Sequence, residues 1–281
     1  MTLTRLVLFS GWGIDARIWQ PLIACLHARL AHVTETDEQA DKQAADEADD
    51  EAKSCPLEII APDWSEEGPQ AESRTGSQEP SASQASSLGG ADTLWLGWSL
   101  GALRAEALAK KQAPATLVSL AMGPSFIDQA PSEQMIPALA PEVLDTFRTA
   151  FARNPAASWQ HFLRWQASGE ASARDCLRQL RELIGRHPVS REAVLATGLA
   201  ELASRQMSLA PQSELPLEFW LGKQDPLLAS GLSAALRAQG QVVAEFEGGH
   251  CLPLSAPEAL ADALLTRMGL ATHVTRISEE A

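Results

Sequence analysis

The pentapeptide Gly97-Trp98-Ser99-Leu100-Gly101 constrains the fold more than any other stretch of this sequence. An apolar, strand-like run at 93–96 precedes it, and the run rich in Ala and Leu at 102–111 has a helix-forming composition. Glycines on both sides of the serine permit a tight turn where a strand and a helix pass close together. The pattern therefore predicts a strand, a sharp turn that presents the Ser99 hydroxyl, and a helix. The alternative is an ordinary turn with an incidental serine.

Strand-like and helical segments alternate along most of the chain. Further strands are predicted at 6–9, 57–61, 116–120, 217–221 and 241–246. Helices are predicted at 19–30, where apolar residues recur on one face, and at 257–268. Alternation of this kind is typical of a parallel sheet with helices on both faces. The predicted fold class is therefore α/β with a mostly parallel sheet.

A wholly helical stretch interrupts this alternation after Ser125 and extends to about Met207. Apolar residues recur in it at helical spacing, in the groups Leu144, Phe147 and Phe151, then Phe162, Leu163 and Trp165, then Leu177, Leu180 and Ile184. A helical block inside an α/β order is expected to form a cap. We therefore expect a core of residues 1–124 and 208–281 and a helical cap of residues 125–207.

Two polar tracts stand apart from this pattern. Residues 35–67 hold thirteen acidic residues against two lysines, a net charge of −11, and residues 66–90 are dominated by Ser, Gln, Glu, Gly and Ala. Because apolar periodicity is scarce there, we expect 35–55 and 66–90 to be flexible polar insertions. The formal net charge of −14 for the chain argues against general nucleic-acid binding. No apolar run approaches the roughly 20 residues that span a bilayer.

The cysteines and the N-terminus indicate the compartment. The sequence does not begin with a basic region, a long apolar stretch and a small-residue cleavage site, so export is not expected. Cys25, Cys55, Cys176 and Cys251 are widely scattered and show no C-x-x-C spacing. We therefore expect reduced thiols and a cytoplasmic location. The chain is also expected to be a monomer with no membrane contact, no metal and no cofactor.

A serine hydroxyl is a weak nucleophile at neutral pH, so Ser99 needs a base and an acid that orients the base. In hydrolases with this turn, the acid and then the base follow the serine, in turns at the carboxyl ends of strands. Asp225 follows the predicted strand 217–221, and His250 lies in the glycine-rich turn after 241–246. The other five histidines lie in helical or terminal segments. We predict Ser99, Asp225 and His250 as the catalytic set; the alternatives are a structural histidine and an Asp-Pro turn initiator.

Attack on an ester creates a negatively charged oxygen, which preorganised N–H donors stabilise. One predicted donor is the backbone N–H of Leu100, the residue after the nucleophile. The other is expected in the turn Ser10-Gly11-Trp12-Gly13 after the first long strand, where Trp12 is the candidate. The alternative for this segment is a glycine turn that merely ends a strand.

The segments Phe9-Ser10-Gly11-Trp12-Gly13 and Leu96-Gly97-Trp98-Ser99-Leu100-Gly101 resemble the pimeloyl-acyl-carrier-protein methyl ester esterases of biotin synthesis, the BioH type within the α/β-hydrolase superfamily. Helical residues similar in type and spacing to that family's cap are Phe162, Leu163, Gln166, Gly169, Ala173, Arg174 and Arg178. The resemblance departs at Ser10, where the family has histidine, at His161, where it has arginine, and between Trp64 and Thr93.

The resemblance implies an α/β-hydrolase fold and release of methanol from the methyl ester of pimeloyl-acyl-carrier protein. Ser99 is then the group that attacks the ester carbonyl, and His250 protonates the departing methanol. Trp12, Trp98 and Phe162 are implied as lining of the acyl pocket, although each could be ordinary packing.

A basic surface is expected because carrier proteins are acidic. Residues 148–191 contain eight arginines against three acidic residues, a net charge of +5. Arg174, Arg178 and Arg181 have i, i+4, i+7 spacing, which places them on one helix face, and they are the predicted contacts to the acyl-carrier protein. The alternative is a solvated helix face with local ion pairs.

Two other functions fit the same residues. One is a broad-specificity carboxylesterase or thioesterase that acts on small acyl substrates without a carrier protein. The other is a hydrolase-like binding protein without turnover. The presence of Ser99, Asp225 and His250 together argues against the binding protein, which has no need of all three.

Overall fold

A parallel six-stranded sheet forms the centre of the computed structural model, which describes residues 2–41, 57–65, 68–70, 88–129, 136–188, 190–209 and 215–270. The strand order is β2-β1-β5-β6-β7-β8, and every neighbouring pair is parallel. The strands are β1 (Arg5–Phe9), β2 (Glu58–Ile60), β5 (Gly90–Trp98), β6 (Pro114–Leu120), β7 (Leu217–Gly222) and β8 (Val242–Phe246). The prediction of an α/β fold with a parallel sheet is confirmed.

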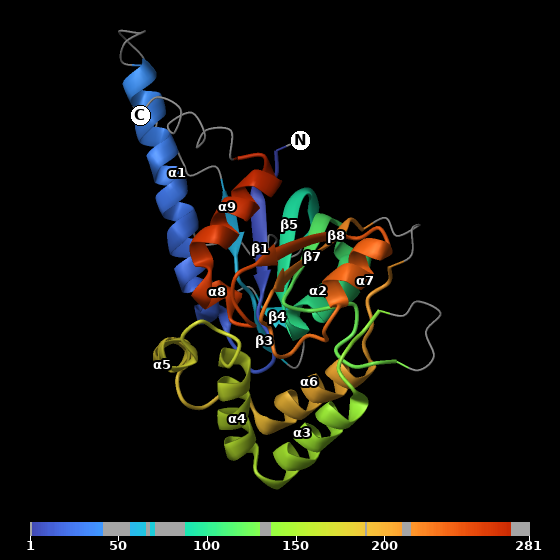
Figure 1. Cartoon of the computed structure of the whole chain (residues 1–281). Helices are drawn as coiled ribbons and strands as arrows, with labels where there is room; N and C mark the ends of the chain where they lie inside the picture. The colour runs from blue at the N-terminus through green and yellow to red at the C-terminus, as the bar shows by residue number, and fades with distance from the viewer. Residues whose placement is uncertain are drawn as a thin grey trace.

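Helices cover the two faces of this sheet (Figure 1). On one face α1 (Gln20–Asp41), which follows the short 3-10 helix η1 (Ala16–Trp19), packs against α9 (Pro257–Met268). On the other face α2 (Leu100–Gln112) packs on β5 and β6, and α7 (Leu232–Ala238) packs on β8. The short helix α8 (Leu252–Ser255) leads from the end of the sheet into α9.

Both faces of the central strands are apolar, which is why helices can cover both. In β1, Leu6 and Leu8 point to one face and belong to the large core cluster that includes Leu22 of α1. Val7 and Phe9 point to the opposite face and pack in a second cluster with Ala105 of α2. All four β1 side chains are fully buried, so this strand is fixed in register from both sides.

Four helices between β6 and β7 form a separate layer at the carboxyl ends of the strands (Figure 1). They are α3 (Pro141–Arg153), α4 (Pro155–Ala167), α5 (Ala173–Ile184) and α6 (Glu192–Ser204), and we call them the α3–α6 layer. In it α4 packs against α3 and α5, and α6 packs against α3. No helix within the described part of the chain combines the length and apolar character needed to cross a membrane.

The acidic tract begins within a helix. Helix α1 extends to Asp41, so the first residues of the expected insertion 35–55 are helical. The physical reason is that the sequence has no Gly or Pro between Pro21 and Pro56 to end the helix, and Glu, Gln and Ala favour helix. Residues 42–56 of this tract lie outside the described residues.

Part of the second expected insertion also has regular structure. The strands β3 (Asp63–Ser65) and β4 (Gly68–Gln70) form a small antiparallel pair, and residues 88–90 lead into β5. Residues 68–70 pair with β3, and Gly90 pairs with Pro114 of β6, so the segment 66–90 contains regular structure at these positions. Residues 66–67 and 71–87 lie outside the described residues.

The start of α2 lies in close backbone contact with the ends of β1 and β5. A Cβ atom at Gly101 would lie 2.6 Å from the carbonyl oxygen of Ser10 and closer still to that of Phe9. A Cβ atom at Gly97 would lie 2.7 Å from the backbone nitrogen of Ala102. Both neighbours are backbone, which cannot move aside as a flexible side chain can. Glycine at these two positions is therefore required by the packing of strand against helix.

We expect Gly101→Ala to lower the free energy of unfolding by about 3 kcal/mol, because the methyl group overpacks a backbone contact. Urea denaturation followed by circular dichroism measures this loss. The matched control is Gly240→Ala, at a position with φ of +75° and open space around it. That variant carries only the left-handed backbone penalty, about 1 kcal/mol. Equal losses for the two variants would contradict the packing explanation.

Candidate active site

Ser99 lies in a strained turn between β5 and α2. Its φ is +56° and its ψ is −128°, an unusual conformation for a residue with a side chain. The backbone holds this conformation from both sides: the Ser99 N–H donates to the carbonyl of Leu120 at 2.9 Å, and the Ser99 carbonyl accepts from Ala102 at 2.9 Å. Strain that the surrounding structure enforces is common at functional sites. The geometry matches the sharp turn expected from the pentapeptide.

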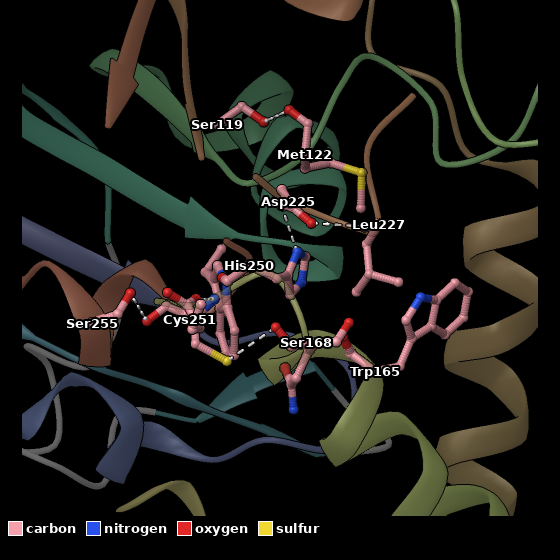
Figure 2. Close-up of polar contacts among 12 residues, drawn as sticks. Ser119, Met122, Trp165, Ser168, Asp225, Leu227, His250, Cys251 and Ser255 are labelled. Atoms are coloured by element: carbon pink, nitrogen blue, oxygen red, sulfur yellow. Dashed lines mark hydrogen bonds and ion pairs between the residues drawn. The ribbon is translucent and has the colours of Figure 1, made fainter. Parts of the chain in front are cut away.

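Asp225 and His250 form a buried hydrogen-bonded pair (Figure 2). Asp225 follows β7 and His250 follows β8, and Oδ2 of Asp225 lies 2.9 Å from Nδ1 of His250. The other oxygen, Oδ1, accepts the N–H of Leu227 at 2.8 Å, which fixes the carboxylate in its plane. The two side chains are 0% and 1% exposed. The structure thus brings together the predicted acid and base, although they are 25 residues apart in sequence.

The second ring nitrogen of His250 has no partner among the described residues. Nε2 is buried and makes no hydrogen bond, so the oxygen of Ser99 is not hydrogen-bonded to it in this structure. Hydrogen bonds between nucleophile and base are often longer in ligand-free enzymes and tighten with substrate. An orienting partner on Nδ1 and a free Nε2 are the arrangement that a general base requires.

Trp98 joins the His250 turn to the Ser99 turn. Its Nε1 donates to the carbonyl oxygen of His250 at 2.8 Å, and the two rings lie 5.5 Å apart, centre to centre. Because Trp98 directly precedes Ser99, this bond holds the His250 turn against the Ser99 turn. The sequence suggested Trp98 only as pocket lining, through the family resemblance. Its side chain is 1% exposed, so in the structure it is chiefly a buried support.

The turn after β1 lies beside Ser99, as expected for the second donor of an oxyanion site. A Cβ atom at Gly11 would lie 3.2 Å from the Cβ of Ser99. Within the part of the chain that the structure describes, neither the N–H of Trp12 nor that of Leu100 has an acceptor. Ser10, which replaces the family's histidine, accepts a hydrogen bond from Nε1 of Trp19 at 3.0 Å and so anchors this turn.

The side chain of Trp12 lies in an aromatic cluster between the sheet and the α3–α6 layer. It is 2% exposed, and its Nε1 donates to the carbonyl of Leu195 in α6 at 2.8 Å. Its ring lies 5.0 Å from that of Phe162 and is nearly perpendicular to it. Phe147, Phe151 and Trp159 complete the cluster. Trp12 and Phe162 therefore meet in space, and they tie the α3–α6 layer to the turn beside Ser99.

The turn between α4 and α5 contacts both catalytic turns, a feature that sequence reasoning missed. Oε1 of Glu170 accepts the N–H of Cys251, next to His250, at 2.8 Å. A Cβ atom at Gly169 would overlap the carbonyl oxygen of Gln224, next to Asp225. No local motif marks these contacts, since they join residues more than 50 positions apart. Only the glycine at 169 hinted at a close approach.

The Cys251 thiol stays protonated beside the base. A hydrogen bond with Cys176, together with complete burial, raises the pKa of Cys251 well above its ordinary value. Since the thiolate is the nucleophilic form of cysteine, Cys251 is not expected to act as a nucleophile. Its backbone N–H, held by Glu170, is its contribution to the site.

The three predicted arginine contacts are not equivalent. Arg174 and Arg178 are exposed on α5, but Arg178 pairs with Asp175 at 3.0 Å and Glu182 at 3.8 Å. Arg181 is half-buried and donates to Oε1 of Gln160 in α4 at 2.7 Å. The guanidinium of Arg181 therefore turns toward α4, whereas Arg174 and Arg178 face solvent. Among the described residues, Arg174 makes no ion pair.

Comparison with known proteins shows which family the sequence matches. The model of the "Alpha/beta hydrolase family" matches residues 6–263. The pimeloyl-[acyl-carrier protein] methyl ester esterase of Vibrio vulnificus (strain YJ016) is 26% identical over 273 residues, which cover 94% of each protein. The protein of the same name from Shewanella woodyi is 29% identical over 228 residues, 80% of this chain and 77% of that protein.

Solved structures with a similar fold include a hydrolase and an esterase from two bacteria. A hydrolase from Oleispira antarctica superposes with a TM-score of 0.62 at 15% identity, over 95% of this chain and 91% of that one. An esterase from Exiguobacterium antarcticum gives a TM-score of 0.61 at 12% identity, over 96% and 93% of the two chains. At these identities the likeness describes the fold alone.

We expect Trp98→Phe to lower kcat/KM for a p-nitrophenyl ester about tenfold, because it leaves the buried carbonyl of His250 without its donor. The matched control is Trp95→Phe, in the same strand. Trp95 donates to the carbonyl of Leu88 at 2.8 Å on the opposite face of the sheet. Both variants lose one indole hydrogen bond, and only Trp98→Phe should slow hydrolysis. Equal rates for the two variants would rule out a positioning role for Trp98.

Proposed function

Because this chain belongs to the alpha/beta hydrolase family and is a carboxylic ester hydrolase, we propose that it cleaves the methyl ester of pimeloyl-acyl-carrier protein through Ser99, His250 and Asp225. The observation that carries the mechanism is the buried Asp225–His250 pair with an unpartnered Nε2 at the edge of the sheet where Ser99 lies. The products are pimeloyl-acyl-carrier protein and methanol.

In the proposed reaction, Oγ of Ser99 attacks the ester carbonyl while Nε2 of His250 accepts the hydroxyl proton. Asp225 keeps Nδ1 protonated and stabilises the imidazolium that forms. His250 then gives the proton to the methoxy oxygen, so the C–O bond breaks and methanol leaves an acyl-enzyme on Ser99. Water, deprotonated by His250, attacks the acyl carbonyl and releases the free acid with Ser99 restored. No cofactor takes part in these steps.

The developing oxyanion is proposed to bind to the backbone N–H groups of Trp12 and Leu100. Two features support this assignment: the turn containing Gly11 lies against Ser99, and both N–H groups lack acceptors among the described residues. Each such donor is worth about two to three powers of ten in rate. The tie between Trp12 and Leu195 gives this donor a fixed position.

The carrier-bound substrate is proposed from the relatives and from charge. Relatives named for this substrate align with up to 94% of the chain, including the α3–α6 layer. We propose that residues 125–207 act as a cap over the site, and that exposed Arg174 and Arg178 attract an acidic carrier protein. We further propose that the enzyme works as a monomer in the cytoplasm, where Cys25, Cys176 and Cys251 remain free thiols.

We expect the double variant Arg174→Ala/Arg178→Ala to lower kcat/KM for the carrier-bound methyl ester about tenfold, because steering of the acidic partner is lost. Hydrolysis of free dimethyl pimelate should be unchanged. The rates are measured side by side at low and high salt, and the difference should shrink at high salt.

The control is Arg29→Ala/Arg237→Ala, which removes the same charge from α1 and α7. Arg29 pairs with Asp262 and Arg237 with Glu245, both away from the α3–α6 layer. If the α5 double variant kept full activity on the carrier-bound ester, the carrier contact would be wrong. If wild type hydrolysed free and carrier-bound esters equally well, a broad-specificity carboxylesterase would be the better description.

A further inference from the structure

A buried cluster of metal-ligating side chains lies directly behind the catalytic base. Glu170 of the α4–α5 turn, Cys176 of α5 and Cys251 each offer one ligand atom, and these atoms lie within 4.8 Å of one another. Their residues are 8%, 6% and 0% exposed. Figure 2 shows Cys251 on the chain next to His250, with its sulfur directed away from the imidazole toward a backbone carbonyl, that of Gln166 at 3.6 Å.

Glu170 brings an uncompensated carboxylate into this cluster. Its Oε1 accepts the N–H of Cys251, but Oε2 is buried and has no hydrogen-bond donor among the described residues. No ion pair within the described chain joins Glu170 to Lys, Arg or His. Gln166, which lies close to Glu170 in sequence, is fully buried. Neither the oxygen nor the nitrogen of its side-chain amide has a hydrogen-bond partner among the described residues. Burying a carboxylate without a counter-charge is costly, so this position calls for a cation.

The donor set identifies the class of cation. Two sulfurs and one carboxylate oxygen suit Zn²⁺ and related thiophilic ions and do not suit Mg²⁺ or Ca²⁺. Zinc–sulfur distances of about 2.3 Å and zinc–oxygen distances of about 2.0–2.2 Å put tetrahedral ligand atoms roughly 3.5–3.8 Å apart. The present spacing needs only small side-chain shifts to reach this geometry. The two sulfurs and the carboxylate oxygen already lie within 4.8 Å of one another, so all three can reach one ion.

We propose that Glu170, Cys176 and Cys251 form a binding site for a thiophilic divalent cation of the Zn²⁺ class. Binding replaces the two thiol protons by one divalent ion, so the net charge of the cluster, −1, does not change. A carbonyl of Gln166 or a water molecule completes the fourth position. The carboxylate of Glu170, whose Oε2 has no hydrogen-bond partner among the described residues, gains the ion as a bonding partner.

The site has a consequence for catalysis, and this consequence rests on the proposed function. Glu170 and Cys176 come from the α3–α6 layer, whereas Cys251 is bonded in sequence to His250. An ion held by all three ties that layer to the base turn and restricts its movement. We expect occupancy of the site to slow ester hydrolysis.

Titration of the purified chain with Co²⁺ under anaerobic conditions tests the site without reference to activity. The Cys25→Ser/Cys55→Ser variant removes the other two thiols and serves as the background. In it we expect thiolate-to-cobalt charge-transfer absorption and the visible bands of tetrahedral cobalt, saturating at one equivalent. Zn²⁺ should bleach these bands with a Kd below about 1 µM.

Two variants in the same background localise the ligands. Cys176→Ala should abolish the charge-transfer absorption, and Glu170→Gln, which keeps both thiols, should weaken binding at least about tenfold. Circular dichroism checks that each variant is folded. If one variant does not fold, the cobalt titration of the Cys25→Ser/Cys55→Ser background alone tests the site. No charge-transfer band in that background, or a band that survives in folded Cys176→Ala, would overturn the site. A mass two hydrogens lower, with no metal bound, would instead show a disulfide and overturn it too.

Activity forms a separate arm. Zn²⁺ should inhibit hydrolysis of a p-nitrophenyl ester in the background variant, EDTA should restore the rate, and folded Cys176→Ala should resist inhibition. Cobalt binding without inhibition would keep the site and remove its catalytic consequence. If the metal-free background variant bound cobalt normally but hydrolysed no ester, the proposed function would be contradicted and the metal site would stand.

Discussion

Close contact of backbone with backbone at the carboxyl edge of the sheet is the constraint on which the site depends. Gly101 lets α2 begin against the end of β1, and this fixes the turn in which Ser99 stands. On the other side of the site, a Cβ atom at Gly222 would meet the carbonyl of Gly249, and one at Gly169 would meet that of Gln224. Because side chains are absent at these crossings, the turns that carry Ser99, Asp225 and His250 lie directly against neighbouring backbone.

Hydrogen bonds then orient the side chains that this packing brings together. Leu227 holds one oxygen of Asp225, the other oxygen holds Nδ1 of His250, and Trp98 holds the His250 carbonyl from the strand that carries Ser99. These bonds leave Nε2 of His250 unpartnered at the centre of the arrangement. A preorganised base needs little rearrangement when substrate arrives, which is the principal way in which such sites lower a barrier.

Sequence patterns predicted what depends on local periodicity and chain order. The strand predicted at 217–221 and the helix predicted at 257–268 match β7 and α9 within one residue. The order of Ser99, Asp225 and His250 anticipated that the last two would meet. Helix α1 continues into the acidic tract because charge does not end a helix where Gly and Pro are absent.

Contacts made by tertiary closure could not be predicted in this way. Helical spacing placed Arg181 with Arg174 and Arg178, but the neighbouring helix α4 decides that its guanidinium turns to Gln160. Cys176 and Cys251 are 75 positions apart in sequence, so no spacing rule brings them to Glu170. The expectation of no metal came from the absence of a local C-x-x-C motif. The absence of a local motif does not exclude ligands that come together only in the folded chain.

Covalent labelling of the nucleophile tests whether His250 activates the hydroxyl of Ser99. A fluorophosphonate reacts with a serine only when a base activates its hydroxyl, and peptide mass spectrometry then locates the adduct. We predict one adduct, on Ser99, and labelling at least about a thousandfold slower in His250→Ala. Ser119, whose buried hydroxyl donates to the carbonyl of Met122 at 2.8 Å, should remain unmodified. An adduct on another residue, or an unchanged labelling rate in His250→Ala, would contradict the assignment of Ser99 and His250 as nucleophile and base.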